Sequence, residues 1–289
     1  MAFVDSSNLI GDTEALRKRA QEDGYLYFSE LLPTGEVEAL REQLVELCEK
    51  HDFYDRPPIG PGGEIDAERV GPYYSEAYRL RQVHGIPKHP AILDVYRRLW
   101  GRDPLPHART VLRTMPHGTG QVWPVHQDYP NVATHDEVWN TWIPVGDCPE
   151  KLGSLAILEG SHKLGPTRSR RLADNGLVID EPPEGCRWLS QDLRCGDVLM
   201  FSTLTFHKGQ SNLLPGKLRL SLDNCIQPWD TPFNYGSFDL HTGDYGLYNR
   251  DTDWDAIYQT WSDDDPLKYY WKKFPVEFVE ALDMPIQRS

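Results

Sequence analysis

The sequence predicts a mainly β protein in which a double-sheet jelly roll is covered on one outer face by helices. Two observations support this fold class. Apolar residues recur with helical spacing up to about residue 100, and from residue 109 onward they alternate with polar residues as in strands. Short strand-like runs then follow one another between glycine, proline and asparagine turns. Helices followed by many short strands are typical of a layered sandwich.

The N-terminal part, about residues 12–100, is expected to be helical. Asp12 or Thr13 can cap a first helix that ends at Gly24, and Thr34 can cap a second. A tract rich in proline and glycine separates the second helix from the third and predicts a long loop. The expected elements are helices at about 12–23, 35–51 and 90–100, a short strand at 25–28 and a loop over 55–72.

The core, about residues 105–228, is expected to hold the jelly roll. Its strands are predicted at 109–115, around His126, and at 137–145, 154–158, 188–191, 197–207 and 218–226. An aromatic-rich C-terminal extension follows at 229–289, whose rings either pack onto the sandwich or line a substrate pocket. No linker-like stretch divides the chain, so residues 1–289 are expected to form a single domain.

Composition excludes several classes of function. The chain has 30 basic and 44 acidic residues, and the net charge of −14 disfavours nonspecific binding to nucleic acid or to an anionic membrane. No apolar stretch has the length of a secretory signal or a membrane span, so a cytoplasmic location is expected. The five cysteines are odd in number and form no C-x-x-C pair, which argues against a zinc knuckle or a disulfide framework. The charge balance says little about a small-molecule substrate.

Residues 125–130 carry the pattern on which the predicted function depends. In an extended strand, His126 and Asp128 point to the same face about 7 Å apart, and together they form half of a metal site. The third ligand is expected to be His207, which follows an apolar run over residues 198–206. Two histidines and one carboxylate form the facial triad of non-haem Fe(II) oxygenases, which leaves the opposite face of the metal open.

A second motif of the same kind, His135-Asp136-Glu137, competes with the first. Ten histidines and 44 acidic residues make a chance match common. His126 follows a strand-like stretch rich in valine and tryptophan, whereas His135 lies in a stretch with the composition of a loop, so His126 and Asp128 are favoured. The remaining histidines considered are expected in turns, in loops or on the surface rather than on the metal: His107, His117, His162 and His241.

Arg219 lies twelve residues after His207, and the turn-rich residues 211–217 between them predict an antiparallel hairpin. In a register that places His207 opposite Ser221, Arg219 faces inward about 7 Å further along the ladder. That distance is close to the reach of a five-carbon dicarboxylate, which a guanidinium can hold by two parallel hydrogen bonds. A register shifted by one residue would turn Arg219 outward, so this arrangement is a prediction.

An ordered set of motifs resembles the phytanoyl-CoA dioxygenase family of Fe(II)/2-oxoglutarate oxygenases. The resemblance covers about residues 12–228, and the ordered set is far more specific than any of its members. The motifs are Glu22-Asp23-Gly24-Tyr25-Leu26, His126-Gln127-Asp128, Gly153-Ser154-Leu155 with Gly160-Ser161-His162, Gly196-Asp197-Val198-Leu199-Met200-Phe201 leading to His207, and Arg219-Leu220-Ser221.

The resemblance implies a double-stranded β-helix core that binds Fe(II) through His126, Asp128 and His207. It also implies that the cosubstrate 2-oxoglutarate contacts Arg219, Gln127, Ser221 and an aromatic residue, for which the candidate is Trp142. The implied activity is hydroxylation of an unactivated C–H bond of a small organic molecule by O₂, with release of succinate and CO₂. Desaturation, epimerisation or ring closure stay open, because the same cofactor chemistry serves them.

Two rival functions make different demands on these residues. A noncatalytic jelly-roll binding protein would need neither Asp128 nor Arg219. A zinc-dependent hydrolase or isomerase of cupin type would use the triad without Arg219 and without O₂. Among substrates, a CoA thioester would be expected to require a basic cluster, and the densest basic run is residues 168–171. A free small molecule, such as a natural-product intermediate, is therefore favoured.

Overall fold

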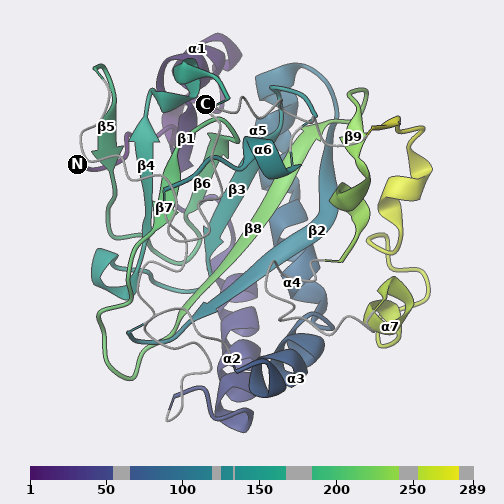
Figure 1. Cartoon of the computed structure of the whole chain (residues 1–289). Coiled ribbons are helices and arrows are strands. Elements are labelled where there is room, and N and C mark those ends of the chain that lie inside the picture. The colour runs from purple at the N-terminus through teal and green to yellow at the C-terminus, as the bar shows by residue number, and fades with distance from the viewer. Residues whose placement is uncertain (55–65, 119–124, 133, 167–183, 241–252, 280–289) are drawn as a thin grey trace, which may run out of the picture.

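The strands of the computed structural model form one large and two small sheets, and helices cover one face of the large sheet (Figure 1). The structure describes residues 1–54, 66–118, 125–132, 134–166, 184–240 and 253–279. The strand order is β1-β6-β3-β8-β2 in the five-stranded sheet, β5-β4-β7 in the three-stranded sheet and β10-β9 in the two-stranded sheet. Neighbours in the two larger sheets are antiparallel. A mainly β protein with antiparallel sheets and flanking helices is thus confirmed.

The elements follow one another in this order along the chain. The α-helices are α1 (Thr13–Asp23), α2 (Thr34–Lys50), α3 (Ala67–Ala77), α4 (Arg81–Gly85), α5 (Pro90–Trp100), α6 (Tyr129–Val132) and α7 (Trp254–Tyr258). Short 3-10 helices are η1 (Ser7–Leu9), η2 (Ile86–Lys88), η3 (Glu150–Leu152), η4 (Ser161–Leu164), η5 (Tyr235–Phe238) and η6 (Tyr270–Lys273). The strands are β1 (Tyr25–Phe28), β2 (Pro104–Met115), β3 (Trp139–Pro144), β4 (Leu155–Glu159), β5 (Arg187–Leu189), β6 (Val198–Ser202), β7 (His207–Gly209), β8 (Arg219–Pro228), β9 (Phe233–Asn234) and β10 (Phe278–Val279).

Helix α1 begins and ends where its sequence predicts. The Oδ1 atom of Asp12 accepts a hydrogen bond of 3.0 Å from the backbone N–H of Ala15, which caps the helix. Gly24 ends it at φ +77°, and a Cβ atom there would lie 2.1 Å from Nδ1 of His162. His162 therefore packs against the end of α1, and its Nε2 lies 3.0 Å from the carbonyl oxygen of Gln21. It has a structural place in a turn, as expected.

Two expectations for the helical part are wrong. Helix α2 includes Thr34 and is preceded by Pro33, and no side chain caps it. The loop expected up to residue 72 gives way to α3 at Ala67; the part of that loop at 55–65 lies outside the described residues. Pro72 lies inside α3. Its cost to the helix is offset because α3 and the residue after it bury Val70, Tyr73, Tyr74, Ala77 and Tyr78.

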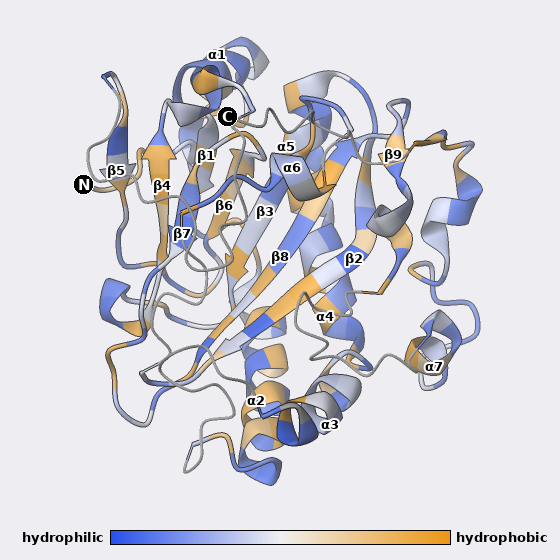
Figure 2. Cartoon of the chain, in the orientation of Figure 1, coloured by the Kyte–Doolittle hydropathy of each residue, from blue (hydrophilic) through white to orange (hydrophobic). Residues whose placement is uncertain are grey.

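The helices pack on the outer face of the five-stranded sheet. Along β8, Leu220, Leu222 and Ile226 point into the core cluster that the helices share, while alternate residues point to the opposite face. Figure 2 shows the resulting alternation of hydrophobic and hydrophilic bands along β8. The polar alternate residues are thereby directed toward the interior between the sheets.

Polar side-chain groups from the helical elements that cover the sheet hydrogen-bond to threonines of the sheet. These side chains cannot be left unpaired in a buried layer without a cost in stability. The observed pairs are Tyr73 with Thr114 at 2.7 Å, Tyr96 with Thr141 at 2.8 Å and Lys88 with Thr110 at 3.2 Å. Each pair fixes a helical element at one place on the sheet.

The strand predicted over 197–207 is two strands in different sheets. Strand β6 pairs with β1 and β3 in the large sheet, whereas β7 pairs with β4 in the three-stranded sheet. The hairpin predicted between His207 and Arg219 is therefore wrong, because β8 pairs with β2 and β3. His126 makes an isolated antiparallel bridge with His207 instead of lying in a full strand.

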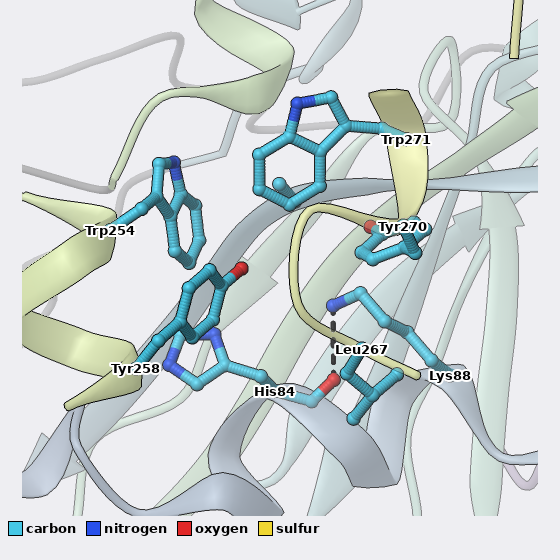
Figure 3. A pocket seen from close by; sticks show the side chains of 8 residues that line it. His84, Lys88, Trp254, Tyr258, Leu267, Tyr270 and Trp271 are labelled. Atoms are coloured by element: carbon cyan, nitrogen blue, oxygen red, sulfur yellow. Dashed lines mark hydrogen bonds between the residues drawn. The ribbon is translucent and has the colours of Figure 1, made fainter. Parts of the chain in front are cut away.

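Several aromatic residues of the C-terminal extension pack onto the body of the protein, while Tyr235 and Phe278 are exposed. Tyr258, Trp261 and Trp271 belong to the main core cluster. Trp254, Tyr258, Tyr270 and Trp271 also line a small pocket together with His84 and Lys88 (Figure 3). Among the described residues, no helix combines the length and the apolar character needed to cross a membrane.

Lys88 is a buried amine with neutral hydrogen-bond acceptors. It is 7% exposed, and its Nζ donates to the carbonyl oxygen of His84 at 3.0 Å and to Oγ1 of Thr110 at 3.2 Å. Burial lowers the pKa of Lys88 to about 7. In the unfolded chain a lysine titrates near pH 10.4, so between about pH 7 and 10 the unfolded chain binds more protons than the folded protein at this site.

Stability is therefore expected to rise with pH across this window. The contribution of Lys88 is fully favourable above the unfolded pKa and is lost as the pH falls toward 7. We expect the difference in free energy of unfolding between wild type and Lys88→Met to change by up to about 1.4 kcal/mol per pH unit. Urea unfolding at pH 7, 8 and 9 measures it, with the exposed Lys18→Met as control. Parallel pH profiles of wild type and Lys88→Met would contradict the expectation.

Candidate metal centre

His126, Asp128 and His207 come together between the two larger sheets. Their candidate ligand atoms all lie within 4.8 Å of one another. Oδ1 of Asp128 is 3.5 Å from Nε2 of His126, and Oδ2 is 3.5 Å from Nε2 of His207. Ligands bonded about 2.1 Å from one ion lie about 3 Å apart in adjacent positions, so small movements place all three around one metal.

The backbone brings the two histidines side by side. The N–H of His126 donates to the carbonyl oxygen of His207 at 3.1 Å, and the reverse bond measures 3.0 Å. The two ring centroids are 4.3 Å apart. Asp128 follows two residues after His126, and its carbonyl oxygen accepts a hydrogen bond from the backbone N–H of Val132 in α6. A two-residue spacing thus delivers the carboxylate beside the imidazoles, although the segment is not part of a sheet.

The protonation states of the triad suit metal binding. Burial opposes ionisation of Asp128, but His207, His126 and a hydrogen bond from Asn140 together hold the pKa of Asp128 well below its usual range. Burial lowers the pKa of His207 to about 4, against the opposing charge of Asp128. His207 Nδ1 lies 3.0 Å from the carbonyl oxygen of Thr205, which can only accept, so Nε2 keeps its lone pair for a metal. A neutral imidazole and a charged carboxylate are the forms that ligate.

The competing motif makes a different set of contacts. Nδ1 of His135 lies 3.5 Å from Oε2 of Glu137, and the same carboxylate forms an ion pair with Arg102. Within the described part of the chain, His126, Asp128 and His207 are the one group of three or more such side chains gathered closely enough for a metal. The preference for His126 and Asp128 over the second motif agrees with this geometry.

Arg219 faces inward, as predicted, but through a different pairing. It is 2% exposed, and its Nη1 donates to Oγ of Ser221 at 2.7 Å. Its Nη2 reaches β7, where a Cβ atom on Gly209 would lie 3.4 Å away. Gly209 is two residues beyond His207. The guanidinium of Arg219 therefore extends from β8 to the strand that carries His207, and its Nε is buried without a partner among the described residues.

The other residues proposed to contact 2-oxoglutarate occupy different surroundings. Ser221 is buried beside Arg219. Trp142 is 1% exposed and lies in the apolar cluster between the sheets, two residues from Asn140 on the same strand. The Nε2 of Gln127 donates to the carbonyl oxygens of Gly165 at 3.0 Å and Leu204 at 2.6 Å. Contacts of these residues with the cosubstrate stay predictions.

The remaining histidines lie away from the triad where the structure describes them. His107 was expected in a loop or on the surface, which is wrong: it lies in β2, is 2% exposed and pairs with Oε1 of Gln227 at 2.9 Å. Its ring packs against the rings of Phe233 and Phe238, which bury it beside the β2–β8 pair. His117 is exposed, as expected. His241 lies outside the described residues.

Two polar features of the site were missed from the sequence. Asn140 donates to Oδ2 of Asp128 at 2.8 Å. Arg113 and Asp223 form an ion pair of 2.6 Å on the interior face of β2 and β8. The alternation in the strand over 137–145 already placed Asn140 on the face of Trp142. The partners of all three side chains depend on strand order, which periodicity does not reveal.

Comparison with known proteins agrees with this geometry. The family model of phytanoyl-CoA dioxygenase (PhyH) matches residues 20–217. A 1-deoxypentalenic acid 11-beta-hydroxylase of Streptomyces exfoliatus is 28% identical over 247 residues, which is 78% of this chain and 85% of that protein. The enzyme of the same name from Streptomyces arenae is 27% identical over 248 residues, again 78% of this chain and 85% of that protein.

Solved structures share the fold. The non-heme alpha ketoglutarate dependent carbocyclase SnoK from nogalamycin biosynthesis has a TM-score of 0.55 at 21% identity, covering 76% of this chain and 85% of that chain. The epimerase SnoN, in complex with Fe3+, alpha ketoglutarate and nogalamycin RO, has a TM-score of 0.53 at 21% identity, covering 75% and 84%. Because the family model spans more than half of the sequence, the chain belongs to the phytanoyl-CoA dioxygenase (PhyH) family.

Proposed function

We propose that the protein is an Fe(II)/2-oxoglutarate-dependent dioxygenase that hydroxylates an unactivated C–H bond of a small organic molecule. The observation that carries the proposal is the convergence of His126, Asp128 and His207, together with a buried arginine, Arg219, whose guanidinium reaches the strand of His207. A natural-product intermediate is the proposed class of substrate. Support comes from the relatives, which are named for hydroxylation of 1-deoxypentalenic acid. The two larger sheets are proposed to form a double-stranded β-helix, or jelly roll, within a single domain over residues 1–289.

Separate groups of residues would bind the metal and the cosubstrate. His126, Asp128 and His207 would hold the metal on one side and leave its other side open to ligands. Arg219, with Ser221 beside it, would take the distal carboxylate of 2-oxoglutarate through charge-assisted hydrogen bonds. Gln127 and Trp142 are proposed as further determinants of the cosubstrate site. Burial of Arg219 strengthens its attraction for a carboxylate, because little water competes there.

The bound iron, together with 2-oxoglutarate and O₂, supplies the oxidising chemistry that the side chains lack. The balanced reaction converts substrate R–H, 2-oxoglutarate and O₂ into R–OH, succinate and CO₂. One oxygen atom of O₂ enters the product and the other enters succinate. Desaturation, epimerisation and ring closure are alternative outcomes for the same site, and the mass and ¹⁸O content of the product separate them from hydroxylation.

The proposal is tested by anaerobic reconstitution with Fe(II) and 2-oxoglutarate. A weak visible metal-to-ligand absorption band is expected when Fe(II) and 2-oxoglutarate bind together at the proposed site. Admission of O₂ should bleach the band and produce succinate. Failure of the wild-type chain to develop the band would overturn the proposal and favour a noncatalytic or zinc-dependent protein. A zinc enzyme would also retain its activity without O₂.

A cytoplasmic location is proposed together with this function. Iron in the ferrous state and free thiols both suit a reducing compartment. The five cysteines form no disulfide with one another, and Cys48, Cys148 and Cys195 are buried. The expectation that the protein binds neither nucleic acid nor membranes rests on the net charge of −14.

A further inference from the structure

Asn140 is a buried polar residue at the centre of the large sheet. It lies on β3, with Phe201 of β6 on one side and Cys225 of β8 on the other. Its side chain faces the interior, since β3 alternates and Asn140 shares a face with Trp142. The residue is 6% exposed. Because β3 is hydrogen-bonded on both sides, its backbone is among the most rigid parts of the protein.

The carboxamide of Asn140 points at the metal carboxylate. Its Nδ2 donates to Oδ2 of Asp128 at 2.8 Å. Chemistry fixes the direction of the amide, because a carboxylate accepts hydrogen bonds and would repel the amide oxygen. The Oδ1 of Asn140 is consequently turned away, and it is buried without a partner among the described residues. A buried carbonyl without a donor is unfavourable, so this orientation serves the contact with Asp128 and not the fold of β3.

Asp128 needs an anchor of this kind. Its segment is attached to the three-stranded sheet by the isolated bridge at His126, and α6 begins at the next residue. In the absence of other restraint, its carboxylate can rotate about its terminal bond, which has a broad energy minimum. The hydrogen bond from Asn140 ties Oδ2 to the rigid sheet. Oδ1 lies 3.5 Å from Nε2 of His126 and Oδ2 lies 3.5 Å from Nε2 of His207. Because the amide of Asn140 occupies Oδ2, Oδ1 is the oxygen with more lone-pair capacity left for a metal.

We propose that Asn140 is a positioning residue that fixes the orientation of the Asp128 carboxylate and so presents one oxygen to the metal. The inference rests on the proposed function, since it assumes that the triad binds a divalent ion. Asn140 itself need not touch the metal. Partners that hold a ligand in this way typically contribute about 10- to 100-fold to metal affinity. The residue also links the two sheets, because Asp128 belongs to the segment beside β7 and Asn140 belongs to β3.

The test compares Asn140→Leu with wild type in titrations of Co(II), a stable substitute for Fe(II) whose absorption reports coordination geometry. Leucine has the same branched arrangement of four side-chain heavy atoms as asparagine, although it is larger, and it lacks the donor. We expect Co(II) affinity to fall about 10- to 100-fold and the visible spectrum to change, while the melting temperature of the metal-free protein stays close to wild type. Asn140→Ser, which is smaller and keeps a hydroxyl, should show a lesser loss and keeps the test open if the leucine variant does not fold.

Thr141→Val is the matched control. Thr141 is the next residue of β3, is fully buried and hydrogen-bonds to Tyr96 on the helical side of the sheet. Its replacement should lower the melting temperature and leave the Co(II) affinity and spectrum unchanged. If folded Asn140→Leu or Asn140→Ser binds Co(II) within twofold of wild type with the same spectrum, the positioning role is wrong. If the wild-type chain itself binds no Co(II), the proposed metal function fails instead.

Discussion

Replacement of Asp128 by alanine is expected to abolish product formation and to weaken Fe(II) binding by more than about 100-fold. Loss of a residue that merely orients a ligand already costs about 10- to 100-fold, and Asp128 would supply a ligand atom and the negative charge of the proposed triad. The substitution also leaves His126 and His207 without the carboxylate between them. Anaerobic titration of Fe(II), followed by the visible band with 2-oxoglutarate, measures the effect.

The second histidine-acid motif provides the control for this experiment. Glu137→Ala removes a carboxylate that also lies 3.5 Å from a histidine ring, but that carboxylate is paired with Arg102. Iron binding and turnover of Glu137→Ala should remain near those of wild type. If Glu137→Ala loses iron while Asp128→Ala retains it, the metal lies at His135 and Glu137, and the assignment of the triad is wrong.

Replacement of Arg219 by alanine should raise the dissociation constant for 2-oxoglutarate strongly. Removal of one partner from a buried charge pair costs about 2–5 kcal/mol, which corresponds to roughly 30- to 5,000-fold in affinity. Arg219→Lys should lose affinity as well, because an ammonium group cannot form the two parallel hydrogen bonds of a guanidinium. Titration of the Fe(II) form with 2-oxoglutarate under anaerobic conditions gives both constants.

Iron affinity serves as the internal control for Arg219. The guanidinium is paired with Ser221 and reaches Gly209, and neither residue is a metal ligand. Fe(II) binding measured before addition of 2-oxoglutarate should therefore stay within a few-fold of wild type in Arg219→Ala. Unchanged affinity for 2-oxoglutarate in a folded Arg219→Ala protein would place the distal carboxylate elsewhere. A combined loss of iron and cosubstrate would indicate that the arginine supports the fold.

Local pattern was sufficient to predict most elements and the triad. Helices α1 and α5 and strand β1 have the predicted bounds within one residue, because caps, glycine stops and apolar spacing are local signals. The triad could be predicted because a two-residue spacing and a histidine at the end of an apolar run limit the choices. Residues 67–72 misled the prediction, since composition favoured a loop while burial of the tyrosines in α3 favoured a helix.

Strand pairing could not be predicted in the same way. The turn-rich residues 211–217 are compatible with a tight hairpin, but they instead connect two sheets. Whether β8 pairs with β7 or joins the large sheet depends on the burial of Leu220, Leu222 and Ile226. These residues pack against helices that are distant in sequence. The inward orientation of Arg219 was predicted correctly although the pairing was not. Residues that alternate with the buried Leu220 and Leu222 must point to the opposite face of β8. The contact of Asn140 with Asp128 and the ion pair of Arg113 with Asp223 depend entirely on strand order, so local pattern could not predict them.

Because β7 and β8 belong to different sheets, 2-oxoglutarate bound at the proposed site would connect the two sheets. With one end on the metal beside His207 and the other on Arg219, 2-oxoglutarate would link the two sheets reversibly. A ligand that binds only the folded state stabilises that state against unfolding. Tryptic cleavage after Lys217, in the segment that joins the two strands, should therefore slow when metal and cosubstrate are both present, so proteolytic lifetime reports occupancy without turnover.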